Sequence, residues 1–117
     1  MRSVARGLGP VAMNVLTELW LGMPLGAYTA TRGWTPEQVA AEVDALESAG
    51  LVADAALTPA GQRFRDDLEA TTDALEAPIV DALGEHLDAD VAALAEWSAA
   101  CVAARAFPPD AFKRAAG

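Results

Sequence analysis

Apolar residues recur every three or four positions along most of this chain, which is the spacing of one face of an α-helix. The pattern predicts five helices, separated by short segments that contain Gly, Pro or both. We expect these helices at approximately 11–21, 25–32, 35–49, 58–84 and 88–107, with the end of the chain forming at most one further turn.

The third of these helices has the clearest boundaries. Thr35 is a suitable N-cap, Pro36 fits the first helical position, and Gln38 completes a capping box. Gly50 follows the last turn, where a residue in the left-handed conformation commonly ends a helix. Trp34 comes directly before the cap, so we expect it to pack back onto the helix as a hydrophobic staple.

A short extended segment follows the third helix. The pairs Leu51-Val52 and Ala56-Leu57 flank Asp54, which predicts a very small hairpin. A helix, a hairpin and a long helix in this order are typical of a winged helix. We therefore predict an all-α fold, a winged helix-turn-helix with a minimal wing and additional carboxy-terminal dimerisation helices. One domain is expected over residues 1–107, followed by a tail at 108–117.

The last two long helices carry two further expectations. Pro78 lies within the apolar stripe of the fourth helix, so we expect a kink or a break near Leu75. Asp88 is a suitable cap for the fifth helix. The apolar residues of that helix are expected to form its buried side: Val91, Leu94, Trp97, Cys101 and Val102.

The charge of the chain argues against nucleic acids and membranes as partners. Seventeen acidic residues against eight basic ones give a net charge of −9, whereas phosphate backbones are bound through Lys and Arg. The third helix, which a DNA-binding winged helix places in the major groove, carries only acidic charges: Glu37, Glu42, Asp44 and Glu47. Arg32 is the sole basic residue near that face, and Arg63 and Arg65 are expected in surface ion pairs.

The composition also disfavours several kinds of site. Cys101 is the one cysteine and His86 the one histidine, so we expect neither an intrachain disulfide nor a metal site. The sequence contains no Gly-rich phosphate loop, and no cofactor is predicted. No apolar run is long enough to span a bilayer, and the amino end does not match a signal peptide. We therefore expect a reduced, cytoplasmic protein.

Asn14 and Glu18 lie one turn apart on the first helix, among apolar residues. The ordinary interpretation is that they form a solvated stripe, because Glu is rarely buried without a partner. The alternative is that they line a pocket between this helix and the helices of a partner copy. In such a pocket Glu18 could serve as a catalytic acid or base. The sequence leaves both interpretations open.

Three large amphipathic side chains complete the candidate ligand site, namely Trp20, Tyr28 and Trp97. In a helical domain such residues usually belong to the core or to a dimer interface. Trp97, on the fifth helix, can equally form the floor of a ligand cavity. The candidate ligand-binding residues are therefore Asn14, Glu18, Trp20, Tyr28 and Trp97.

Three phrases of the sequence suggest a family. Arg32-Gly33-Trp34-Thr35, Leu57-Thr58-Pro59-Ala60-Gly61 and Glu69-Ala70-Thr71-Thr72-Asp73 resemble the carboxy-terminal part of a bacterial helix-turn-helix family, over residues 9–107. More distantly, the Leu-Thr-x-x-Gly turn resembles MarR-type winged-helix proteins, where it leads into a dimerisation helix. The resemblance implies the fold and a homodimer, but no particular chemistry. Longer family members have a further amino-terminal half, so another domain or a partner protein could complete the site.

Three hypotheses for function follow. The first is a small-molecule-binding or accessory winged-helix protein that does not bind DNA, with a role in secondary metabolism as one form of it. The second is a MarR-type transcriptional regulator, for which a basic stripe would be needed. The third is a cofactor-free enzyme that uses Glu18 in an apolar pocket. The sequence names neither a ligand nor a reaction.

Overall fold

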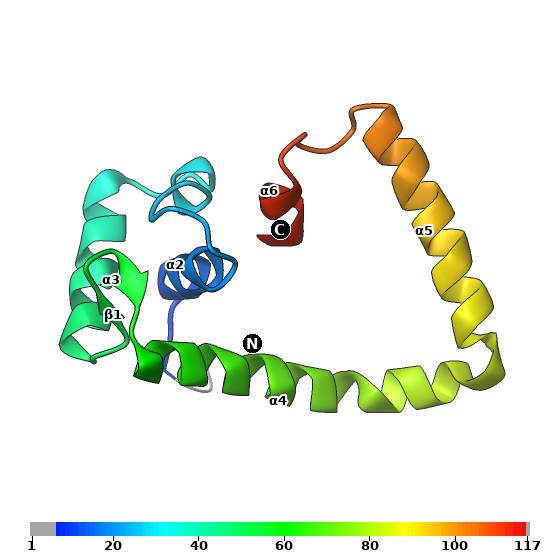
Figure 1. Cartoon of the computed structure of the whole chain (residues 1–117), viewed down its shortest axis with the longest axis horizontal. Helices are drawn as coiled ribbons and strands as arrows, with labels where there is room; N and C mark the ends of the chain where they lie inside the picture. Colours follow the sequence, from blue (N-terminus) through cyan, green and yellow to red (C-terminus); the bar gives the residue numbers. More distant parts are fainter. Residues whose placement is uncertain (1–6, 117) are drawn as a thin grey trace. The chain divides into compact units, whose positions relative to one another are not determined.

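The computed structural model describes residues 7–116, and the chain divides into two compact units, the first ending at Ala70 and the second beginning at Thr71. The described part is mostly helical, with one small sheet of two strands (Figure 1). The elements, in chain order, are α2 (Pro10–Trp20), η1 (Thr29–Thr31), α3 (Pro36–Ser48), β1 (Val52–Ala53), β2 (Ala56–Leu57), α4 (Pro59–Leu83), η2 (Gly84–His86), α5 (Leu87–Ala103) and α6 (Ala111–Ala116).

Helix α2 is at the centre of the first unit. Its residues Ala12, Val15 and Leu16 form the core together with Leu46 of α3 and Val52 of β1. Side chains from the neighbouring loops, from β2 and from the first turns of α4 pack around this cluster. The wide apolar arc in the sequence of α2 therefore has a physical cause, since this helix is covered on most of its sides.

The boundaries of α3 follow from local hydrogen bonds, as the sequence predicts. The backbone N–H of Gln38 donates to Thr35 Oγ1 (3.2 Å), and the backbone N–H of Thr35 donates to Gln38 Oε1 (2.9 Å), which completes the capping box. Pro36 occupies the first turn, where its missing N–H is not needed. Gly50, with φ +76°, takes the left-handed conformation just after the helix.

The predicted hairpin is present between α3 and α4. Strands β1 and β2 are antiparallel, with Val52 opposite Leu57 and Ala53 opposite Ala56. The turn between them consists of Asp54 (φ 51°) and Ala55 (φ 58°). Two positive φ values are what a two-residue hairpin turn requires, because they match the right-handed twist of the strands. Asp tolerates this conformation better than Ala does.

The phrase Leu57-Thr58-Pro59-Ala60-Gly61 joins the hairpin to α4, and its residues have structural roles. Thr58 Oγ1 donates to the carbonyl of Gly50 (2.6 Å) and accepts from the backbone N–H of Gly61 (3.0 Å). The N–H of Thr58 donates to the carbonyl of Leu51 (3.0 Å). Gly61 is buried against that same carbonyl, where a Cβ atom would collide with it. The residues of this phrase thus connect the segment just after α3 to the start of α4 through hydrogen bonds and close packing.

The helix expected at 25–32 is wrong. This segment is a series of turns that ends in η1, a single 3₁₀ turn. Gly26 has φ +86°, which no α-helix accommodates. The backbone N–H groups of Gly26, Tyr28 and Thr29 donate to the side chain of Glu18 instead of to carbonyls within a helix.

Of the kink or break expected near Leu75, the break is wrong, because α4 continues through Pro78 to Leu83, and the kink stays a prediction. Pro78 cannot donate to the carbonyl four residues before it, that of Ala74. Ala74 and its neighbours are exposed, so water can bond to the freed carbonyl and the helix is not forced to stop. It ends, as predicted, at Gly84, whose φ is +52°.

Two expectations for α5 need correction. The helix begins at Leu87 with no side-chain cap, and Asp88 lies within its first turn, where a carboxylate still favours the helix dipole. Its predicted buried side is exposed, with Trp97 at 66% and Leu94 at 58%. Among its described residues the second unit has no buried side chain, whereas the first unit has a core. Part of the predicted tail folds as α6, which Asp110 caps.

We predict that Gly61→Ala lowers the free energy of unfolding by roughly 1–3 kcal/mol, although Ala is the better helix former. The added Cβ has no space beside the Leu51 carbonyl. The control is Arg63→Ala, at an exposed position of the same helix, where a change within about 0.5 kcal/mol is expected. Urea unfolding followed by circular dichroism measures both. Equal stability of the two variants would contradict the proposed tight junction.

Candidate functional site

Glu18 is completely enclosed, so the predicted solvated stripe is wrong for this residue. Its Oε1 accepts the backbone N–H of Gly26 (2.7 Å), and its Oε2 accepts those of Tyr28 (2.9 Å) and Thr29 (2.8 Å). An ionised carboxylate offers acceptors alone, and here three donors converge on it. Among the described residues, no basic side chain forms an ion pair with Glu18.

These contacts give Glu18 a structural task. The segment between α2 and α3 would otherwise bury three backbone N–H groups without acceptors, which costs free energy for each group. One side chain satisfies all three and holds the segment against α2. Tyr28 and Thr29 are buried as a result. The catalytic hypothesis gains no support from this geometry, because both carboxylate oxygens of Glu18 already accept hydrogen bonds from backbone N–H groups.

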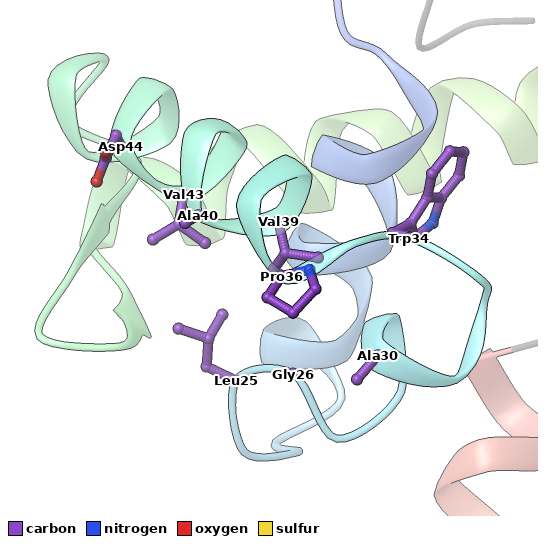
Figure 2. Close-up of a pocket in the computed structure, with 9 residues that line it drawn as sticks. All are labelled: Leu25, Gly26, Ala30, Trp34, Pro36, Val39, Ala40, Val43 and Asp44. Carbon is purple, nitrogen blue, oxygen red and sulfur yellow. The ribbon is translucent and has the colours of Figure 1, made fainter.

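The same segment forms one wall of an open groove of about 570 Å³, and α3 forms the other (Figure 2). Leu25 faces Val43 across this groove. Asp44 is at one end of the row of lining side chains, and Trp34 is at the other. The complete lining consists of Leu25, Gly26, Ala30, Trp34, Pro36, Val39, Ala40, Val43 and Asp44.

The groove differs from the ligand site that the sequence suggests. Asn14, Glu18, Trp20 and Tyr28 belong to the first unit but do not line the groove, and Trp97 belongs to the second unit. Asn14 is half-buried. A shared ligand site for these five residues stays a prediction.

Trp20 makes a contact that sequence reasoning misses. The guanidinium of Arg65, on α4, lies over its ring at 4.3 Å from the centroid, and the indole N–H donates to Asp66 Oδ1 (2.8 Å). Arg65 forms the expected ion pair, with Glu69 at 2.7 Å, but its own side chain is buried and not at the surface. The sequence does contain a signal for this contact. Arg65 precedes the apolar Leu68 by three residues, which places both on the inner side of α4.

Comparison with known proteins places the domain in a family. A model of a helix-turn-helix family matches residues 1–108. The chain belongs to this helix-turn-helix family. No curated protein and no solved structure match it.

The exposed surface of α3 in this helix-turn-helix domain is acidic. In α3, Glu37, Asp44 and Glu47 are exposed, and residues 36–48 include no basic side chain. Arg32 follows the groove residue Ala30 closely in the sequence. Its guanidinium lies over the Tyr28 ring, 5.2 Å from the ring centroid. Within residues 7–116, no group of three or more His, Cys, Asp and Glu side chains is suited to hold a metal ion. In that same range, no helix has the length and apolar character needed to cross a membrane.

We predict that Glu18→Gln lowers the free energy of unfolding by about 2–4 kcal/mol, because an amide places a donor where a backbone donor already points. The matched control is Glu47→Gln, an exposed position on α3 where a change within about 0.5 kcal/mol is expected. Urea denaturation of both variants measures the difference. A Glu18→Gln variant as stable as the control would remove the structural role.

Proposed function

We propose that this helix-turn-helix chain is a small-molecule-binding or accessory protein of the winged-helix type, that it acts as a homodimer, and that it does not bind DNA. The observation that carries the proposal is the character of α3. One side of this helix is exposed and acidic, and another side walls an apolar groove. We also propose that the protein acts in the cytoplasm and in secondary metabolism; this part of the proposal rests on the sequence alone.

Electrostatics support the absence of DNA binding. A protein that holds DNA neutralises several phosphates with Lys and Arg, and loses affinity steeply where acidic side chains replace them. Residues 7–70 contain nine acidic and three basic residues. One of the basic residues, Arg65, is buried and paired with Glu69. The tip of the hairpin carries Asp54 and no basic residue that could enter a minor groove.

A MarR-type transcriptional regulator is the alternative, and one observation favours it. Helix α3, the hairpin and the long α4 follow one another in the order of a winged helix (Figure 1). Helix-turn-helix domains commonly place their second helix in the major groove. The order of elements is compatible with either function, so the charge of α3 is the feature that separates them.

Dimerisation is supported by the second unit. All the large apolar side chains that are most exposed in the described chain belong to it, with exposed fractions between 38% and 66%: Leu75, Ile79, Val80, Leu83, Val91, Leu94, Trp97, Val102, Phe107 and Phe112. Large apolar side chains are seldom left exposed in such number on a folded domain unless another surface covers them. A second copy of the chain offers the same surface, as a two-fold interface requires.

DNA binding is the first test of the proposal. We expect fluorescence anisotropy with a mixed-sequence duplex to show negligible binding at physiological salt. Replacing Glu37, Asp44 and Glu47 together with Lys should produce salt-dependent, sequence-independent binding, since the repulsion becomes attraction. Sub-micromolar, sequence-specific binding by the unaltered chain would overturn the proposal and favour the regulator.

Assembly is the second test. Light scattering at high micromolar concentration should give twice the chain mass of 12.1 kDa. Trp97→Glu should shift the protein toward the monomer, because a charge on this apolar helix must be desolvated on association. Ala41→Glu, at an exposed position of α3, is the control and should leave the dimer intact. A monomeric unaltered chain would contradict the dimer.

A further inference from the structure

The groove beside α3 has an uneven chemistry that indicates what it can hold. Eight of its nine lining residues are uncharged, and the ninth is Asp44. Leu25, Val39 and Val43 provide apolar surface that would lose water contact on binding. An apolar body therefore fits the middle of the groove, and a positive group fits the end at which Asp44 lies (Figure 2).

A second negative charge lies behind the wall of the groove. Gly26 lines the groove, and its backbone N–H donates to the enclosed carboxylate of Glu18 at 2.7 Å. A charge surrounded by protein is screened far less than a charge in water. The three N–H donors share the charge of Glu18 through hydrogen bonds but do not cancel it. Its field therefore extends into the groove and disfavours anions there.

Within residues 7–113, no basic side chain lines the groove to offset these charges. Arg32, two residues beyond Ala30, is held over the Tyr28 ring. An exposed carboxylate at one end and a second carboxylate behind the wall distinguish this groove from an ordinary apolar depression, which has no feature that favours a cation over an anion.

We infer that the groove binds an organic ammonium ion that carries an apolar chain or ring. The apolar part lies between Leu25 and Val43, and the ammonium group lies toward Asp44. This inference rests on the proposed small-molecule function and names the ligand class. It depends on two observations, the lining of the groove and the position of Glu18 behind Gly26.

Three ligands with one eight-carbon chain isolate the effect of charge: octylammonium, octanol and octanoate. The amine is protonated at pH 7, as a Lys side chain is. Titration of ¹⁵N-labelled protein, followed by NMR, reports the site through the amide signals of Gly26, Ala30 and Ala40. We expect octylammonium to shift these signals and to bind about tenfold more tightly than octanoate, with octanol in between.

Matched variants locate the charge effect. Asp44→Asn should weaken octylammonium binding about three- to fivefold and leave octanol binding unchanged, which is the range of one partly exposed ion pair. Asp54→Asn changes the net charge equally, but at the hairpin tip, and should have no effect. Ala40→Phe fills the groove and should abolish binding of all three ligands, whereas Ala41→Phe on the same helix should not.

The outcomes separate this inference from the broader proposal. Equal affinities for the three ligands at the groove would overturn the preference for a cation and leave small-molecule binding in place. Equal effects of Asp44→Asn and Asp54→Asn would overturn the role of Asp44. Shifts confined to amides outside the groove, or no shifts at all, would overturn the site itself. DNA binding is measured separately and tests the proposed function without reference to the groove.

Discussion

The first unit of this protein depends on one enclosed carboxylate. Glu18 extends from α2 into the segment that leads to α3, and three backbone N–H groups of that segment donate to it. Burying a carboxylate is costly unless its acceptor capacity is used, and burying an N–H group is costly unless it finds an acceptor. Each requirement satisfies the other. The segment therefore folds as turns around Glu18 and not as the helix that its sequence pattern suggests.

That constraint also shapes the surface from which function is inferred. The turns around Glu18 place Leu25 and Gly26 opposite α3, and the groove lies between them. The same carboxylate leaves a negative charge behind the wall of the groove. A residue that the sequence offers as a possible catalyst thus has a structural role, and we propose that its charge also affects the neighbouring groove. The acidic side chains of α3 likewise favour a positive over a negative ligand.

The two units differ in how their apolar residues are satisfied. The first unit encloses its own core, with Leu16, Leu46 and Val52 almost fully buried. The second unit exposes apolar residues along α5, such as Leu94 and Trp97. A helix that is apolar on most sides is stable when several neighbours surround it. The first unit therefore contains the proposed ligand groove, and the second presents the surface on which association is proposed.

The sequence by itself determined the features that depend on neighbouring residues in the chain. Thr35 and Gln38 cap α3, Gly50 ends it, and the small hairpin follows, because capping and tight turns are formed within a few residues. The helix-turn-helix family could also be recognised from short phrases, one of which proves to be the tight junction at Gly61.

Only the tertiary structure decided the features that depend on distant residues. The burial of Glu18, the stacking of Arg65 on Trp20 and the exposure of Trp97 each require knowledge of which elements meet. A helical pattern shows that a side chain lies on an apolar face, but not whether protein, ligand or water covers that face. For the same reason the groove could not be predicted, since one of its walls is held in place by a side chain from a third element, α2.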